Sequence, residues 1–317
     1  MLLVVMCTAT LAVSQRQSCE GARRPVIVIG LDGLGSAYLN ERNMQAWAPN
    51  LATMFSDAAW TLDAQAFVPV LSMPNWASLL LGTSPAVTNI IDNEFTDSAS
   101  IRQRCTTLMD AVEQMTGMTT SIFLNWMPLR NLIGRANPAA GTVDESSARD
   151  VVLTFLNTKL LSSFTFIHLD TIDSAGHKFG WGTPQYFNAI TEADTLIGNI
   201  MKRAELDDAI VVVVADHGGL GRQHDINAPE ARRVPIAFWS SRPLDINKRQ
   251  IATIRNLADV AATILHVMGI PRPAHWTGAS AAPDIFACDV GPAAIEASSG
   301  RSCILPSRSR RVLSPNF

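Results

Sequence analysis

Short runs of consecutive apolar residues alternate along the chain with segments in which apolar residues recur every three or four positions. The strongest runs cover residues 25–31, 163–169 and 209–215. Each is rich in β-branched residues and predicts a buried parallel strand. Weaker runs over 119–124 and 233–239 predict two further strands.

Two of the intervening segments carry signals typical of helices. Thr183 precedes a proline at the first helical position, and apolar residues then recur from Phe187 to Ile200. Residues 255–268 repeat this spacing and end at Gly269. Strands that alternate with helices predict an α/β fold, a three-layer α/β/α sandwich with a mostly parallel central sheet.

The composition fits one large globular domain. The chain has 317 residues, of which 47% are hydrophobic and 17% charged. Its net charge of −3 gives no reason to expect bulk binding of nucleic acid. We expect a catalytic domain over residues 25–290 and a flexible tail, rich in Ser, Pro and Arg, over residues 291–317.

The N-terminus is almost wholly apolar over residues 1–13. This run is too short for a stable membrane span and predicts a signal peptide over residues 1–19. The protein would then be secreted, lumenal or periplasmic; an uncleaved membrane anchor and a buried strand are the alternatives. Without Cys7, an even number of cysteines remains, and the sequence leaves their pairing open. They are Cys19, Cys105, Cys288 and Cys303.

Acidic residues follow the three strongest runs, as Asp32, Asp170 and Asp216. Because the carboxyl ends of parallel strands meet at one edge of a sheet, we expect these carboxylates to converge. Asp216 is followed directly by His217, and His224 lies seven residues further on.

A second acid and imidazole, Asp173 and His177, stand four residues apart. Carboxylate and imidazole ligands of this mix suit Zn²⁺ first and Mn²⁺ second. Ser72 precedes Pro74 at a predicted helix start, where free N–H groups favour a phosphoryl group. Alone it would be a capping serine, but a nearby cation could make it a nucleophile.

Six motifs together resemble, in the right order, the type I phosphodiesterase/nucleotide pyrophosphatase family of the alkaline phosphatase superfamily. The resemblance covers roughly residues 25 to 280. The motifs are VIGLDG at 28–33, SMPN at 72–75, GTSP at 82–85, NIIDN at 89–93, DSAGHK at 173–178 and ADHG at 215–218. Serine replaces the family's usual threonine at position 72, and Thr88 stands where a histidine is common.

The resemblance implies an alkaline-phosphatase-like fold with two divalent metals, Zn²⁺ before Mn²⁺. The metal that activates the serine would be held by Asp32, Ser72, Asp216 and His217. The metal that delivers water would be held by Asp173, His177 and a third histidine. For that third ligand His224 is preferred to His275, because it follows the glycine-rich turn directly.

The resemblance also implies residues that contact the substrate. Asn75 would donate to a phosphoryl oxygen. Trp76 and Phe95 would stack a nucleobase, with core packing as the alternative. Apart from the resemblance, Lys178 and Arg222 lie near enough in sequence to meet the additional charge of a phosphate monoester. The expected partner is therefore a small phosphodiester or nucleotide, and no stable membrane span is expected.

The implied activity is hydrolysis of phosphodiester or phosphoanhydride bonds through a phosphoseryl intermediate on Ser72. A phosphomonoesterase, a phosphoethanolamine-type transferase and a catalytically silent binding protein are the alternatives. A sulfatase is rejected, because Trp76 stands where those enzymes need arginine. Phosphoglycerate mutases and phosphopentomutases carry a large inserted domain for which this chain has little room.

Overall fold

An eight-stranded sheet forms the centre of the protein. The computed structural model describes residues 24–115, 117–136, 143–144, 147–242, 245–287 and 303–305. The strand order is β4-β3-β5-β1-β6-β7-β2-β8, and β7 alone runs against the other strands. The strands are β1 (Val26–Leu31), β2 (Ala59–Gln65), β3 (Thr120–Leu124), β4 (Val143–Asp144), β5 (Phe164–Leu169), β6 (Ile210–Val214), β7 (Arg233–Ser240) and β8 (Arg249–Gln250).

The predicted α/β fold with a mostly parallel sheet is confirmed, and all five predicted strands are present. The strand β2 was not predicted, because buried and half-buried positions alternate along it instead of forming an apolar run. It pairs antiparallel with β7 and extends the sheet beyond the parallel part. The two-residue strands β4 and β8 were also missed.

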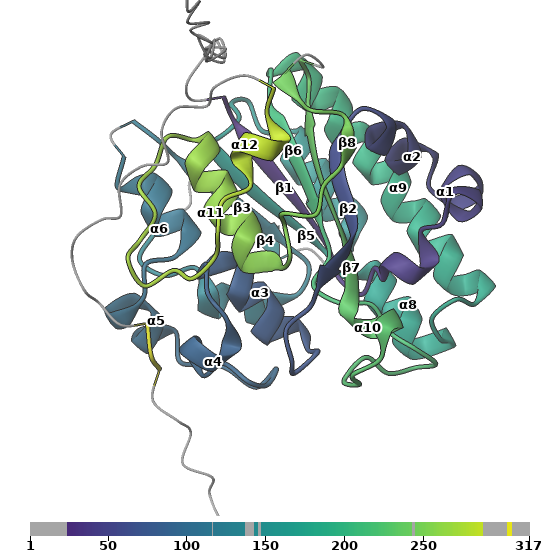
Figure 1. The fold of residues 1–317 in the computed structure, drawn as a ribbon, viewed down its shortest axis with the longest axis horizontal. Helices are drawn as coiled ribbons and strands as arrows, with labels where there is room; N and C mark the ends of the chain where they lie inside the picture. The colour runs from purple at the N-terminus through teal and green to yellow at the C-terminus, as the bar shows by residue number, and fades with distance from the viewer. Residues whose placement is uncertain are drawn as a thin grey trace, which may run out of the picture.

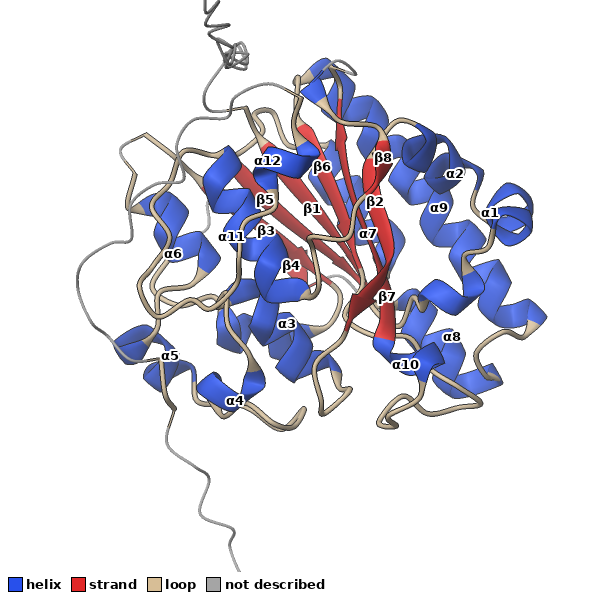
Figure 2. Ribbon diagram, in the orientation of Figure 1, coloured by secondary structure: helices blue, strands red, loops and turns tan. Residues whose placement is uncertain are grey.

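Helices cover both faces of the sheet, which makes the three layers visible in Figures 1 and 2. On one face α3, α6 and α11 pack together, and on the other α9 packs against α1, α2, α7 and α8. The helices of the first face are α3 (Ser72–Leu80), α4 (Pro85–Thr88), α5 (Ser98–Arg104), α6 (Leu108–Glu113), α11 (Leu257–Val267) and α12 (Ala282–Ile285). The others are α1 (Glu41–Trp47), α2 (Pro49–Ser56), α7 (Ala148–Leu156), α8 (Thr171–Phe179), α9 (Pro184–Leu206) and α10 (Pro229–Arg232), with the 3₁₀ helix η1 (Ser36–Tyr38). A second 3₁₀ helix, η2 (Met127–Leu132), packs against α3 and α5 of the first face.

The helix signals in the sequence have the expected physical basis. The side chain of Thr183 accepts a hydrogen bond from the backbone N–H of Tyr186 and so caps α9. Asn256 caps α11 in the same way. No helix in the described part of the chain is long and apolar enough to cross a bilayer.

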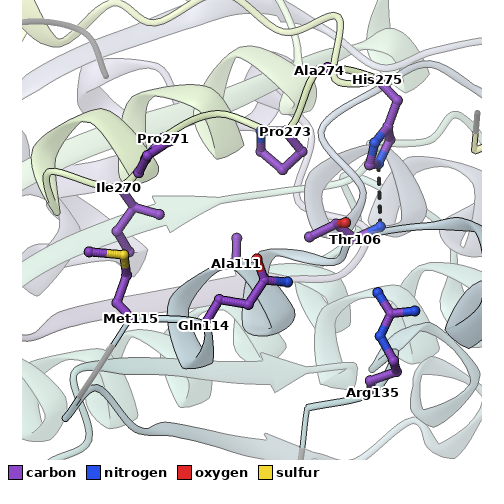
Figure 3. Close-up of a pocket in the computed structure, with 10 residues that line it drawn as sticks. All are labelled: Thr106, Ala111, Gln114, Met115, Arg135, Ile270, Pro271, Pro273, Ala274 and His275. Carbon is purple, nitrogen blue, oxygen red and sulfur yellow. Dashed lines mark hydrogen bonds between the residues drawn. The ribbon is translucent and has the colours of Figure 1, made fainter. Parts of the chain in front are cut away.

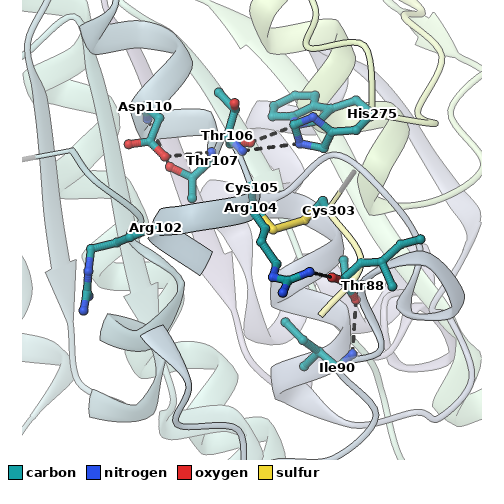
Figure 4. The surroundings of a disulfide bond; sticks show 12 residues. Thr88, Ile90, Arg102, Arg104, Cys105, Thr106, Thr107, Asp110, His275 and Cys303 are labelled. Carbon is teal, nitrogen blue, oxygen red and sulfur yellow. Dashed lines mark hydrogen bonds between the residues drawn. A yellow bond between two sulfur atoms is a disulfide. The ribbon is translucent and has the colours of Figure 1, made fainter. Parts of the chain in front are cut away.

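A disulfide joins Cys105, after α5, to Cys303 near the end of the chain, 198 residues later (Figure 4). Next to it, the backbone N–H of Leu305 donates to the carbonyl of Thr88 at 3.3 Å. The predicted flexible tail is therefore anchored at residues 303–305. The predicted signal peptide, Cys19, Cys288 and the rest of the tail lie outside the described residues.

Candidate metal centre

The predicted metal ligands come from five separate segments that meet at the carboxyl edge of the sheet. β1 lies between β5 and β6, in parallel register with both. Asp32 follows β1, and Asp216 and His217 follow β6. Asp173 and His177 are on α8, which begins directly beyond β5. Ser72 begins α3, and His224 lies in the loop after β6.

The first group of ligand atoms surrounds the ring nitrogen Nε2 of His217. This atom lies 3.1 Å from Ser72 Oγ, 3.3 Å from Asp216 Oδ2 and 3.5 Å from Asp32 Oδ1. Four ligands of a tetrahedral zinc ion, each about 2.0–2.1 Å from the metal, would lie about 3.3–3.4 Å apart. The three distances from His217 Nε2, and the 3.4 Å between Ser72 Oγ and Asp32 Oδ1, are close to the spacing that one tetrahedral cation requires.

The second group consists of Asp173, His177 and His224. Their ligand atoms all lie within 4.8 Å of one another, and His177 Nε2 is 3.4 Å from Asp173 Oδ2. Asp173 belongs to both groups, because its carboxylate also lies within 4.8 Å of ligand atoms of Asp32 and His217. The two groups are therefore adjacent, as in a two-metal site.

The hydrogen bonds of the three histidines fix which ring nitrogen carries the proton. Each Nδ1 lies beside a backbone carbonyl: Gly218 O for His217, Val70 O for His224 and Arg222 O for His177. A carbonyl only accepts, so Nδ1 must donate, and the unprotonated Nε2 faces the cluster. Lone pairs of nitrogen and carboxylate oxygen thus face each other, an arrangement that a shared cation would stabilise.

Two carboxylate oxygens of the cluster support this fit to metal ions. Asp173 Oδ1 and Asp216 Oδ2 are buried and have no hydrogen-bond partner among the described residues. Burial, together with repulsion from Asp32 and Asp170, raises the pKa of Asp173 to about 9. Burial and the charges of Asp32 and Asp173 likewise raise the pKa of Asp216 well above its usual value. Divalent cations would remove this electrostatic cost.

The imidazoles of His217 and His224 are kept neutral, as metal ligands must be. Burial, together with the neighbouring His224, lowers the pKa of His217 to about 3. Burial also lowers the pKa of His224. The His217 and His224 rings stack with centroids 3.8 Å apart, so both rings are held in fixed orientations.

Two residues that were not predicted as ligands orient Asp32. The indole Nε1–H of Trp76 donates to Asp32 Oδ2 at 3.0 Å, and His168 Nε2 lies 3.0 Å from the same oxygen. Burial alone would raise the pKa of Asp32, but the bonds from His168 and Trp76 and the nearby His217 keep it below its usual value. Asp32 Oδ1 remains directed at Ser72 and His217.

A glycine lets two of the ligand segments approach each other. Gly33 has a φ of +76°, and a Cβ there would lie 2.7 Å from the Cα of Asp173. Its backbone N–H also donates to Asp216 Oδ1 at 3.2 Å. The Asp-Gly pair after β1 is therefore needed for the geometry of both carboxylates.

Comparison with known proteins agrees with this geometry. The family described as "Type I phosphodiesterase / nucleotide pyrophosphatase" matches residues 26–227. The chain belongs to this family.

Other similarities are more distant. A 2,3-bisphosphoglycerate-independent phosphoglycerate mutase of Clostridium kluyveri is 29% identical over 155 residues, which are 45% of this chain and 29% of that protein. The chain spans less than a third of the length of the curated relatives it matches.

Solved structures share the fold at low identity. An inactive variant of murine ectonucleotide pyrophosphatase/phosphodiesterase 5, in complex with AMP, has a TM-score of 0.60 at 12% identity; the match covers 78% of this chain and 95% of that one. A protein of the alkaline phosphatase superfamily from Vibrio parahaemolyticus has a TM-score of 0.56 at 14% identity and 81% and 69% coverage.

The phosphoryl-binding role predicted for Asn75 does not fit the structure of this phosphodiesterase family member. Asn75 is fully buried, and its Nδ2 lies 3.0–3.3 Å from the carbonyls of Phe67, Pro69 and Leu71. Its Oδ1 accepts from the backbone N–H of Phe67 at 2.7 Å. Asn75 therefore fixes the loop before Ser72 and has no group left for a substrate.

Asn93 was not singled out by the sequence analysis, but it lies at the start of α3. Its Oδ1 accepts from the backbone N–H of Met73 at 2.9 Å, which places it beside Ser72 at the start of α3. Its side-chain nitrogen has no hydrogen-bond partner among the described residues. The signal was present in the NIIDN motif at 89–93, which the family resemblance had already singled out.

The structure also shows where the other predicted substrate residues lie. Trp76 is fully buried, so it has no exposed face for a nucleobase, and the core-packing alternative describes it. Phe95 is also buried in the core. Lys178 is exposed, with Nζ 5.1 Å from the Phe179 ring. His275 accepts from the backbone N–H of Thr106, away from the cluster, so His224 is the histidine that the fold brings to Asp173.

Proposed function

We propose that the protein is a metal-dependent phosphodiesterase or nucleotide pyrophosphatase that hydrolyses phosphodiester or phosphoanhydride bonds through a phosphoseryl intermediate on Ser72. The observation that carries this proposal is the convergence of Ser72 Oγ with unprotonated His217 Nε2 and the carboxylates of Asp32 and Asp216. Two divalent ions, Zn²⁺ first and Mn²⁺ second, would favour the ionised serine and stabilise the leaving oxygen.

The residues of the chain perform the other tasks. Ser72 Oγ attacks phosphorus, the P–O bond to the leaving alcohol or phosphate breaks, and a phosphoserine forms. Water then cleaves the phosphoserine and restores the hydroxyl. Asn93 Nδ2, oriented by the N–H of Met73, donates to a phosphoryl oxygen, and the N-terminus of α3 favours the same negative charge.

Hydrolysis of a chromogenic phosphodiester, bis-p-nitrophenyl phosphate, should be compared with that of its monoester after chelation and addition of Zn²⁺ or Mn²⁺. Metal-dependent cleavage that favours the diester supports the proposal. Preference for the monoester would assign a phosphomonoesterase instead. Two bound metals without cleavage of either ester would favour a transferase, and loss of both metals and activity would refute the proposed site.

The nucleophile is tested by replacing Ser72. Ser72→Ala should lower kcat at least about 10³-fold, because the remaining groups cannot form the covalent intermediate. Ser72→Thr is the matched control, since it keeps the hydroxyl that the family usually carries. Near-normal turnover by Ser72→Ala would refute the covalent mechanism.

Nucleotides are the substrates to test next, because the murine relative of similar fold was solved with AMP. We also propose that the protein is exported through its N-terminal apolar segment. The Cys105–Cys303 disulfide supports this location, since disulfides persist mainly in oxidising compartments.

A further inference from the structure

A cavity with a volume of about 590 Å³ lies apart from the metal cluster. This volume is in the range of sites that hold small organic molecules. Three segments distant in sequence form it: the loop and end of α6, the segment after η2 and residues 270–275 beyond α11 (Figure 3). None of the residues that line it belongs to the metal cluster.

The two ends of this cavity differ in chemistry. Met115 and Ile270 lie together at one end, and Arg135 and His275 lie at the other with Thr106 between them (Figure 3). An occupant would therefore have an apolar body and a polar head. This division suits a small molecule that carries one polar group on an apolar body.

Arg135 gives the polar end a fixed positive charge. Its backbone N–H donates to Asp110 Oδ1 at 2.8 Å, and its guanidinium donates to the carbonyls of Arg102 and Cys105. These carbonyls are neutral, so they orient the guanidinium without neutralising it. Among the described residues, no carboxylate forms an ion pair with Arg135. A planar guanidinium that is held in place but not paired with a carboxylate of the protein can bind the carboxylate of a ligand.

His275 supplies a second donor and helps to preform the cavity. Its Nε2 accepts from the backbone N–H of Thr106 at 3.4 Å, so the proton is on Nδ1. Burial lowers the pKa of His275 and keeps the ring in this neutral form. The next residue, Trp276, donates its indole N–H to the carbonyl of Thr106 at 3.0 Å. These two bonds hold the wall formed by residues 270–276 against the loop before α6.

We propose that this cavity binds a small organic anion of the aryl or alkyl carboxylate class. Its carboxylate lies at Arg135, and its apolar body lies against Met115 and Ile270.

The test uses 1-naphthoate as the probe and follows its fluorescence during titration of the metal-loaded protein. Saturable binding is expected, and Arg135→Gln should weaken it at least about tenfold, since it removes a charge-assisted contact. Arg102→Gln is the matched control, because it changes a nearby exposed arginine whose side chain does not line the cavity. It should bind as the wild type does.

Two further measurements separate this cavity from other sites. The neutral analogue 1-naphthalenemethanol should bind the wild type at least about tenfold more weakly than naphthoate, and Arg135→Gln should abolish that difference. Asp216→Asn, which alters the metal cluster, should leave naphthoate binding unchanged. The proposal fails if the wild type shows no saturable binding, if Arg135→Gln binds as well as the wild type, or if Asp216→Asn loses binding.

Discussion

Replacing Asn75 separates a structural role from a catalytic one. The Asn75 side chain accepts one hydrogen bond and directs its nitrogen at three carbonyls of the loop 67–71. At about 1 kcal/mol for each of three or four bonds, Asn75→Ala should lower the free energy of unfolding by about 3–4 kcal/mol. For a domain of this size, that corresponds to a fall in Tm of roughly 10 °C.

Asn93→Ala is the matched variant. Asn93 is half-buried and makes one hydrogen bond, to the backbone of Met73, so its Tm should fall by no more than about 3 °C. Its kcat on the phosphodiester should fall about 10²–10³-fold, because a donor to the phosphoryl oxygen is lost. We therefore expect Asn75→Ala to lose mainly stability and Asn93→Ala to lose mainly activity.

Thermal unfolding and steady-state kinetics of both metal-loaded variants distinguish a structural role of Asn75 from a catalytic one. Asn75→Ala can also lose activity, because the loop that it holds carries Val70, whose carbonyl orients His224. Stability is thus the deciding measurement. An Asn75→Ala protein with the wild-type Tm and a large loss of kcat would show that Asn75 contacts substrate and that the geometric reasoning is wrong.

Four further outcomes are expected. Trp76→Phe keeps the aromatic ring but removes the hydrogen bond to Asp32, so metal affinity should fall about 10–100-fold in a competition titration; unchanged affinity would contradict the orienting role. Chelation should lower Tm, because ions present at 1,000 times their Kd stabilise the folded state by about 4 kcal/mol for each site. The fall in Tm on chelation should be smaller for Asp173→Asn than for the wild type. Cys105→Ser opens a loop of 198 residues and should cost up to about 5 kcal/mol in urea unfolding, whereas an unchanged midpoint would mean that the bridge is absent in solution. The pKa of His275 is lower in the folded state than in the unfolded chain, so below about pH 6.5 the unfolded chain binds a proton at this residue more readily. The free energy of unfolding should therefore fall as the pH falls through this range. His275→Gln should make the free energy of unfolding depend less on pH there.

Local sequence was enough to predict five strands of the sheet and the edge at which the candidate ligands meet. Runs of β-branched residues are a local property, and parallel strands bring whatever follows them to one edge. Asp32 and Asp216 could therefore be placed together although they lie far apart in the chain. The caps at Thr183 and Asn256 are local in the same sense, because each acts on backbone groups only a few residues away.

Tertiary structure alone decided between residues of the same chemical type. Asn75 and Asn93 both lie in motifs near Ser72, but only the packing of the loop 67–71 shows that Asn75 is already fully bonded. Burial of Trp76 depends in the same way on neighbours distant in sequence.

The pairing of Cys105 with Cys303 likewise depends on contacts between segments 198 residues apart. The sequence already favoured His224 over His275, but only the packing of the loop after β6 against α8 places His224 beside Asp173. Local sequence encodes the preference of each segment for helix or strand and the periodicity of its apolar residues. The direction of side chains and the contacts between distant segments are set only when the layers of the fold pack together.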